Sequence, residues 1–407
     1  MRSWAGSQDI VVLMRLVLHR LGFVVFDTED SRVVYTVFEV LNSRGLAVDW
    51  LDKTKSVLMG RAYELSASPA AMEAEIDSLE KIWGQIYREI AKEDVPGDET
   101  LRVTATLYYG PGQGKPRSAE DSLDLLREAC TAIEKPREMS ARLLDVARKL
   151  VELYGSPHLG PVTEILHARL LAVAIKSAGG VSGDERGKLL EQWERVTFRI
   201  FGSSDKDSRT KVGDYVRLAS KIVTNDIETR TYNQIIAGLQ QLGKDYPINQ
   251  ALEEGVVGKD CYDHPEECRY LLWSYEEHLA EMAGRGATVD EKVKAEIWRS
   301  RALDSIEHIF QRNAEAQGWR GKMIRPGDAR AQPSVPNVGR IGNLLLLPLP
   351  LNQEAQDFPF DRKKEIYARH NLRMIQEVCK SRDWTLSEIE QREKGIVTWA
   401  KTRWCDI

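Results

Sequence analysis

The sequence has little of what marks a membrane or secreted protein. Its most apolar N-terminal stretch, residues 10–18, contains Arg15 and is too short to span a bilayer. No secretory signal is recognisable, so we expect a cytoplasmic protein without a membrane partner. The 5 cysteines are scattered and odd in number, which favours reduced thiols over a disulfide framework.

The sequence also lacks a strong charge imbalance and a fixed repeat. The formal net charge is −5 over 407 residues, which does not by itself mark a nucleic-acid-binding protein. A whole-chain value can hide a local basic face, so nucleic-acid binding stays open at this point. No period of fixed length recurs, which argues against a solenoid.

Apolar residues recur at helical spacing over most of the chain. This spacing predicts a helix over residues 49–65 and several helices between 98 and 256. Further helices are predicted over residues 270–282, 361–379 and 386–401, with extended segments near 306–310 and 341–348. The length suits two or three domains, and we place them at 1–95, 96–265 and 266–407. The predicted fold class is mainly α.

Two short C-terminal segments carry the residues best suited to chemistry. The first contains Glu307 and His308, and the second runs from Asn343 through four leucines towards Asn352. Imidazole titrates near neutrality, so His308 is a candidate general base, while Glu307 and Asn352 offer oxygen ligands for Mg²⁺. Asn343 is a candidate for orienting the histidine. Neighbouring residues on a strand face opposite ways, so Glu307 and His308 share one site only if the strand ends or bends there.

These segments resemble the HNH nuclease domain at the C-terminus of GmrSD-type (type IV) restriction endonucleases. The matching pattern is a histidine motif, Gly342-Asn343-Leu344, Asn352, and Phe360 followed by Lys363 and Tyr367. In HNH domains of CRISPR effector nucleases, two asparagines also stand nine residues apart, and the acidic residue before the histidine and the later asparagine hold the metal. The histidine motif departs from the pattern in two places: Gln311 stands where a proline is expected, and Glu307 stands where many HNH enzymes carry Asp.

The resemblance implies a C-terminal HNH (ββα-metal) domain embedded in helices, with catalytic roles for His308, Asn343 and Lys363. Metal ligation falls to Glu307 and Asn352, with Mg²⁺ or another divalent cation as cofactor. Basic residues near the site are expected to bind the DNA backbone without reading its sequence. They are Arg312, Arg320, Lys322, Arg340 and Lys364. A solvated basic loop is the alternative for this segment.

A second motif lies near the N-terminus. Residues 38–45, followed by Asp52 and Lys55, resemble part of the ParB-like N-terminal domain of the same family, which binds and hydrolyses nucleotide. Asn42 and Arg44 are the candidate nucleotide-binding residues, on a turn that presents backbone amides. The D-G-Q-Q-R run of that family is absent, so we expect a truncated α+β domain. The chain is then a fragment or a naturally short form, and nucleotide use stays open.

Two other patterns do not support the sites that they suggest. The glycine-rich segment 110–115 lacks both the spacing of a P-loop and a Ser or Thr after Lys115. Cys261, His264 and Cys268 supply three ligands, whereas a structural zinc site needs four.

The sequence therefore predicts a metal-dependent DNA endonuclease of a GmrSD-like defence system that acts on modified foreign DNA. A non-catalytic DNA-binding or regulatory remnant is the main alternative. Two assemblies stay open: a homo-oligomer, and a complex with a second chain that supplies the missing N-terminal half.

Overall fold

The structure is a computed structural model that describes residues 49–66, 68–112, 114–156, 158–204, 206–284, 291–311 and 338–406. The two strands are β1 (Ile306–His308) and β2 (Leu344–Leu346). The helices are α4 (Trp50–Leu65), α5 (Pro69–Ile90), α6 (Gly97–Tyr108), α7 (Ala119–Ala129), α8 (Lys135–Tyr154), η1 (Gly160–Val162), α9 (Leu166–Lys176), α10 (Gly183–Thr197), the π-helix η2 (Phe198–Ser203), α11 (Val212–Val223), η3 (Ile227–Thr229), α12 (Tyr232–Gly243), α13 (Ile248–Gly255), η4 (Cys261–Asp263), α14 (Pro265–Met282), α15 (Glu291–Arg299), α16 (Ala302–Ser305), η6 (Ile341–Asn343), α17 (Leu349–Ala355), α18 (Phe360–Tyr367), α19 (Arg373–Cys379) and α20 (Leu386–Arg403).

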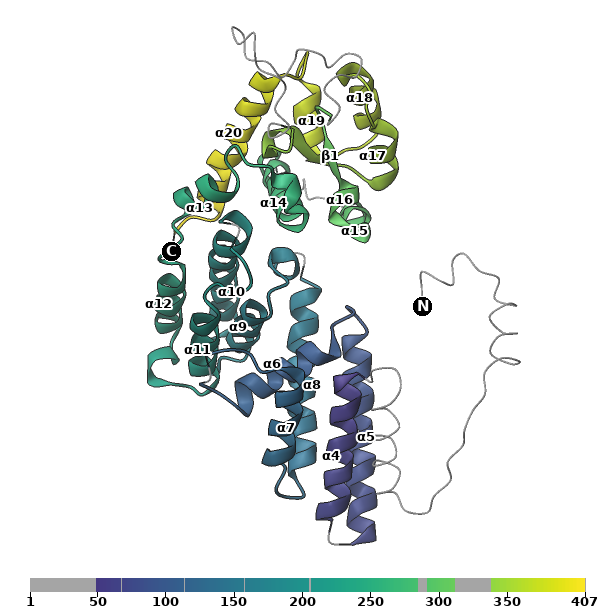
Figure 1. Cartoon of the computed structure of the whole chain (residues 1–407), viewed down its shortest axis with the longest axis vertical. Helices are drawn as coiled ribbons and strands as arrows, with labels where there is room; N and C mark the ends of the chain where they lie inside the picture. Colours follow the sequence, from purple (N-terminus) through teal and green to yellow (C-terminus); the bar gives the residue numbers. More distant parts are fainter. Residues whose placement is uncertain are drawn as a thin grey trace, which may run out of the picture.

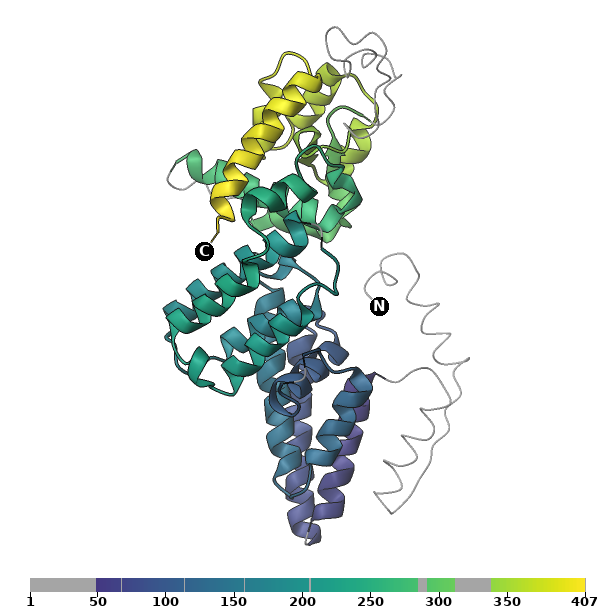
Figure 2. The same ribbon diagram turned by 60° about the vertical axis from the view of Figure 1, so that its left-hand side comes forward.

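The predicted mainly α fold class is confirmed. Helices are spread along the described chain from end to end, and the described sheet has two short antiparallel strands. Figures 1 and 2 show an elongated molecule, with α4–α8 at one end and the helices around β1 at the other. None of the helices described is long and apolar enough to cross a membrane.

The first five helices described form a bundle. α5 packs along α8, and α4 packs on α5, α6 and α7. The core of the bundle is apolar, with Leu58, Leu79, Trp83 and Leu101 fully buried. Since α4 and α5 share this core with α6–α8, the packing crosses residue 95, where the sequence places a domain boundary.

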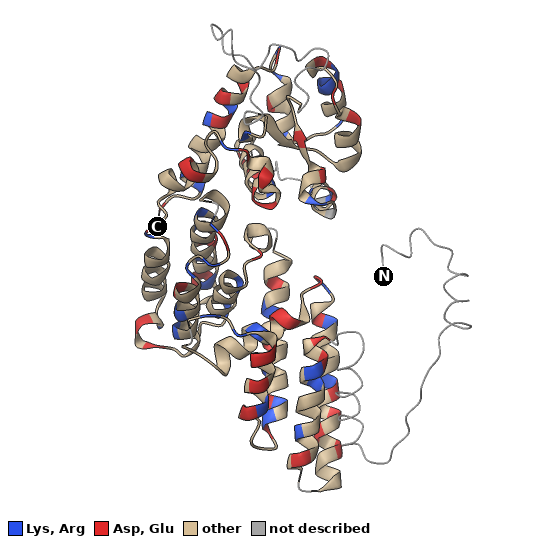
Figure 3. Ribbon diagram, in the orientation of Figure 1, with Lys and Arg blue, Asp and Glu red and all other residues tan. Residues whose placement is uncertain are grey.

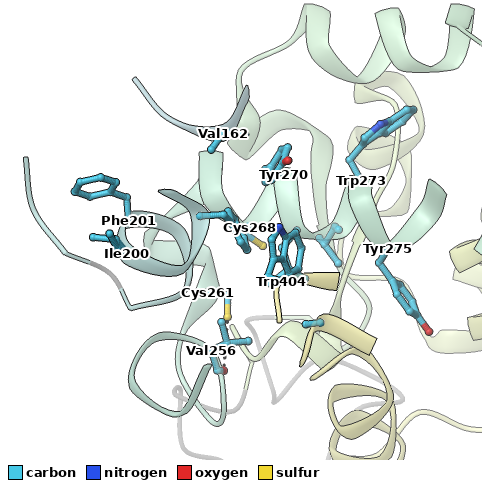
Figure 4. Packing of buried hydrophobic residues seen from close by; sticks show 14 of the residues in the cluster. Val162, Ile200, Phe201, Val256, Cys261, Cys268, Tyr270, Trp273, Tyr275 and Trp404 are labelled. Carbon is cyan, nitrogen blue, oxygen red and sulfur yellow. Dashed lines mark hydrogen bonds between the residues drawn. The ribbon is translucent and has the colours of Figure 1, made fainter. Parts of the chain in front are cut away.

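A second core joins the middle helices to the C-terminal part of the chain. In Figure 4, Tyr270 of α14 and Trp404, which follows α20, lie among residues from the middle helices. Phe198 of η2 contacts both rings, with centroids 5.1 Å from Tyr270 and 4.2 Å from Trp404. The buried Glu194 of α10 accepts hydrogen bonds from the Tyr270 hydroxyl at 2.7 Å and from Trp404 Nε1 at 2.6 Å. This core therefore runs across residue 265, the second predicted boundary.

The C-terminal helices surround the β1–β2 hairpin. The predicted helix 361–379 is wrong in one respect, because the structure has two helices there, α18 and α19. The buried Glu276 of α14 accepts hydrogen bonds from the backbone N–H groups of Arg373 at 2.6 Å and Met374 at 2.8 Å. These donors have no partner within a helix that begins at Arg373, so a side chain from another element satisfies the new helix start.

Candidate nuclease site

The hairpin sets the two faces on which the candidate residues lie. Glu307 pairs with Leu345, and His308 pairs with Leu344. β1 includes both residues and ends at His308, so each keeps the side-chain direction of its strand position. Their side chains face opposite ways, Glu307 towards α18 and His308 towards η4.

Glu307 lies in a sealed polar cluster with two residues of α18. Its Oε1 atom accepts hydrogen bonds from Lys363 Nζ and from the Tyr367 hydroxyl, both at 2.7 Å. Lys363 and Tyr367 are fully buried, and Glu307 is 5% exposed. Lys363 and Tyr367 stand four residues apart, so one face of α18 presents both groups to the carboxylate. Lys363 Nζ also donates to the carbonyl oxygen of His308 at 2.6 Å, which ties α18 to the histidine backbone.

Burial and pairing act in opposite directions on this cluster. Burial raises the pKa of Glu307 above its ordinary value, and the hydrogen bonds and charge of Lys363 oppose that rise. Burial and the nearby Glu307 carboxylate raise the pKa of Tyr367 well above its ordinary value. The Tyr367 hydroxyl therefore stays protonated and donates a hydrogen bond to the Glu307 carboxylate.

Asn343 fastens the end of β1 to its surroundings. Its Oδ1 atom accepts from the Phe310 backbone N–H at 2.7 Å and from Trp384 Nε1 at 3.0 Å. Its Nδ2 atom donates to the carbonyl oxygens of Phe310 and Val338, both at 2.7 Å. The amide thus makes four hydrogen bonds, and it holds the backbone two residues beyond His308.

The segment that carries Asn343 packs closely on α20. A Cβ atom at Gly342 would lie 2.0 Å from the carbonyl oxygen of Ile389, so this approach requires glycine. Arg392 of α20 donates from one guanidinium nitrogen to the carbonyl oxygens of Gly342 at 3.0 Å and Leu344 at 2.7 Å. These contacts fix β2, and through its pairing they also fix β1.

Asn352 lies within α17 and contacts the backbone at the start of β1. Its Nδ2 atom donates to the carbonyl oxygens of Asp304 at 2.8 Å and Ile306 at 3.4 Å. The amide nitrogen, which does not ligate cations, is therefore the atom that faces the strand. Asn352 therefore contacts the backbone that directly precedes Glu307 in the chain.

The predicted metal ligands do not fit a cation in this arrangement. Glu307 Oε1 already forms an ion pair with the Lys363 ammonium group, so a positive charge lies where a cation would bind. Glu307 and His308 face opposite sides of the strand, so they do not converge on one position. Within the parts of the chain that the structure describes, no group of three or more His, Cys, Asp or Glu side chains is arranged to hold a metal ion.

Two of the predicted DNA-binding residues, Arg340 and Lys364, lie within the described residues, and both form ion pairs. Arg340 pairs with Glu393 at 2.5 Å and Glu390 at 3.3 Å. Lys364 pairs with Asp361 at 3.0 Å on its own helix. Figure 3 shows that α20, which carries the two glutamates that pair with Arg340, has both acidic and basic residues along its length. The other predicted residues lie outside the described residues: Asn42, Arg44, Arg312, Arg320 and Lys322.

The zinc pattern that the sequence argues against is part of the core. Cys261 and Cys268 are both buried, and burial raises the pKa of each thiol. Among the residues that the structure describes, Cys261, His264 and Cys268 are not part of any group of three or more His, Cys, Asp or Glu side chains that could hold a metal ion.

Sequence reasoning missed an aromatic neighbour of His308. The ring of Tyr262, in η4, lies 4.4 Å from the imidazole centroid at an interplanar angle of 52°. No motif or spacing connects Tyr262 with His308, because 45 residues separate them in the chain. The position of Tyr367 did carry a signal, since it stands four residues after Lys363 on one helical face.

Residues 246–399 match the family model described as the C-terminal domain of GmrSD restriction endonucleases. This part of the chain is similar to that domain. We call residues 246–399 the GmrSD-like domain. It contains the hairpin and every described candidate residue discussed above, and the match indicates a nuclease of the restriction-endonuclease type. The search of curated proteins finds no match to the chain.

Proposed function

We propose that the GmrSD-like domain is an HNH endonuclease that hydrolyses phosphodiester bonds in DNA, with His308 as general base. The observation that carries the proposal is the family match, which spans both segments that hold the candidate residues. The half-buried position of His308 supports it, because a general base must reach a water molecule beside its substrate. Glu307, in contrast, is sealed from solvent.

The chain's own residues position this histidine through its backbone. Pairing with Leu344 fixes the strand, and the Lys363 ammonium binds the carbonyl oxygen of His308. Asn343 holds Phe310, two residues further on. In this proposal Lys363 and Asn343 support the geometry of the base and do not contact the substrate.

Metal dependence is proposed from the family resemblance alone, because Glu307 and Asn352 do not fit as cation ligands in the arrangement described. A divalent cation would offset charge on the scissile phosphate. Cleavage that stops on chelation and returns with Mg²⁺ supports it. Equal cleavage with and without chelator contradicts it. Action on modified foreign DNA, within a defence system, is likewise proposed from the family resemblance, and plasmid substrates with and without modified bases test it.

The main experiment is a plasmid-nicking assay with the full chain in the presence of Mg²⁺. Substituting His308→Ala is expected to lower the rate about 10²–10⁴-fold, the usual contribution of a general base. His278→Ala is a matched control, because His278 is also half-buried but its ring stacks on Trp399 of α20. Equal rates for wild type and His308→Ala rule out this role for His308.

A second candidate function is DNA binding without cleavage. The sealed Glu307–Lys363 pair favours it, since the carboxylate is not available to a cation in the arrangement described. This candidate predicts binding that weakens steeply with salt and no nicking under any metal condition. A partner chain that supplies a nucleotide-hydrolysing half remains part of this candidate, and co-purification would reveal it.

A further inference from the structure

The imidazole of His308 has an aromatic neighbour from outside the hairpin. The Tyr262 ring lies 4.4 Å from it, centroid to centroid, with the ring planes inclined at 52°. Both side chains are half-buried. This contact lies on the face of β1 opposite the Glu307 side chain, and Lys363 binds the His308 backbone between the two.

The backbone around Tyr262 is fixed at several points. The Asp260 side chain accepts a hydrogen bond from the Tyr262 N–H at 3.1 Å, and the Cys261 N–H donates to the Gly339 carbonyl oxygen at 2.8 Å. A Cβ atom at Gly339 would lie 1.7 Å from the Asp260 carboxylate, so only glycine allows this approach. The buried Cys261 anchors the same turn in the core.

These contacts connect Tyr262 to the same framework as His308. Gly339 lies just before η6, which carries Asn343, and Asn343 binds the backbone of Phe310. The segment 339–343 therefore contacts the backbone next to Tyr262 at one end and the backbone next to His308 at the other. Backbone contacts do not fix the rotation of the imidazole about its side-chain bonds. An adjacent ring does restrict that rotation, because aromatic rings pack in preferred arrangements.

We propose that Tyr262 is a positioning residue that holds the His308 imidazole in one orientation through ring contact. This inference rests on the proposed role of His308 as general base. Tyr262 need not touch the substrate in this role, and its hydroxyl group is not required. The expected effect is therefore on the rate of the chemical step, because small errors in the placement of a catalytic group lower rates strongly.

Two substitutions separate the ring from its hydroxyl group. Tyr262→Phe keeps the ring and is expected to keep kcat within about twofold of wild type. Tyr262→Leu removes the ring and is expected to lower kcat about tenfold with KM unchanged, since orientation and not binding is lost. Tyr232→Leu is the control and should leave kcat unchanged. Like Tyr262, Tyr232 is half-buried, but it lies on α12 and not in η4.

A spectroscopic measurement tests the contact without any activity. In protein with ¹³C-labelled histidines, the ring current of Tyr262 should displace the His308 ring C–H signals, assigned by their loss in His308→Gln. Tyr262→Phe should keep the displacement, and Tyr262→Leu should remove it. If Tyr262→Leu lowers the melting temperature, Tyr262→Met serves as the second variant, because its flexible side chain fills similar space.

The outcomes separate this inference from the proposed function. Unchanged His308 signals in Tyr262→Leu overturn the contact. If Tyr262→Leu moves the His308 signals but the variant stays fully active, the positioning role is overturned and the proposed function stays intact. Displaced signals in a wild-type protein that never cleaves DNA overturn the proposed function, and with it any catalytic role for the contact.

Discussion

The bundle of α4–α8 and the hairpin of the GmrSD-like domain are ordered by different kinds of contact. In the bundle, buried apolar side chains such as Leu79 and Trp83 fill the space between long helices. Around the hairpin, charged and amide side chains bind backbone groups and one another, as Lys363, Asn343 and Arg392 do. The bundle depends mainly on apolar packing, whereas the hairpin combines apolar packing, as at Leu344 and Leu346, with many directional bonds.

The difference follows from the size of the elements. A two-stranded sheet of three residues per strand is too small to be stable alone, so side chains from neighbouring helices must hold it. Directional bonds place backbone atoms more narrowly than apolar packing does, and that suits a region that must hold a catalytic side chain. In such a region a single substitution can leave a buried charge without its partner. The two regions should therefore respond differently to substitution and pH.

The largest expected effect is at the sealed cluster. Lys363→Met leaves the buried Glu307 carboxylate without its counter-charge, and we expect the free energy of unfolding to fall by about 3–5 kcal/mol. The double variant Glu307→Leu/Lys363→Met leaves no buried charge and should be more stable than Lys363→Met alone. Chemical denaturation of the set measures both values. A double variant no more stable than the single one would contradict a dominant ion pair.

The bundle offers the matched apolar case. Leu79→Ala removes a fully buried side chain and should lower the free energy of unfolding by about 3 kcal/mol through the cavity that it leaves. The loss should be equal at pH 5 and pH 8, since no charge changes at the site. The His308 ring signals should stay in place. A shift of those signals would show that the two regions are not independently ordered.

The third prediction concerns Glu276, which caps α19. Burial raises the pKa of this carboxyl to about 7 in the folded protein, from an ordinary value of 4.5, although the backbone donors Arg373 and Met374 oppose the rise. An acid whose folded pKa is raised contributes stability at low pH and loses it as pH rises through the folded pKa. Relative to Glu276→Gln, the wild type should lose about 2 kcal/mol of stability between pH 5 and pH 8. A pH-independent difference between the two proteins contradicts the raised pKa.

The sequence predicts the helices well because their signal is local. The helix predicted over residues 49–65 appears as α4, and the one over 386–401 appears as α20, where Thr385 and Glu388 form a capping box. The break between α18 and α19 was missed because Glu276, which satisfies the start of α19, lies almost a hundred residues earlier in the chain. A capping side chain from a distant element gives no signal in the local sequence of the helix whose end it caps.

The site shows the same division between local and distant information. Spacing and family resemblance select Glu307, His308, Asn343 and Lys363, and the structure brings these four around one strand. Residue types alone do not reveal that Lys363 binds Glu307, because the same lysine would suit a phosphate equally well. Its burial decides its partner, and burial is a property of the tertiary fold.

The smallest expected effect separates anchoring from DNA binding among the basic residues. Arg340 is 13% exposed in its side chain and pairs with the buried Glu393, whereas Lys364 is 24% exposed and pairs with Asp361, which is 87% exposed. Arg340→Gln should therefore lower the free energy of unfolding by about 1–2 kcal/mol, because it leaves a buried carboxylate short of donors. Lys364→Gln should change stability by less than about 0.5 kcal/mol. Both variants lose one positive charge, so a general electrostatic effect on DNA binding is the same in each.

The salt dependence of DNA binding then identifies the phosphate contact. A residue that neutralises one phosphate contributes about 0.9 to the slope of log K against log salt concentration. We expect Lys364→Gln to lower the slope by about that amount and Arg340→Gln to leave it unchanged. The opposite result, a lower slope and unaltered stability in Arg340→Gln, would mean that Arg340 leaves Glu393 to bind DNA. In that case the ion pairs around the hairpin would be exchangeable for phosphate, and the region ordered by directional bonds would also be the one that rearranges on binding.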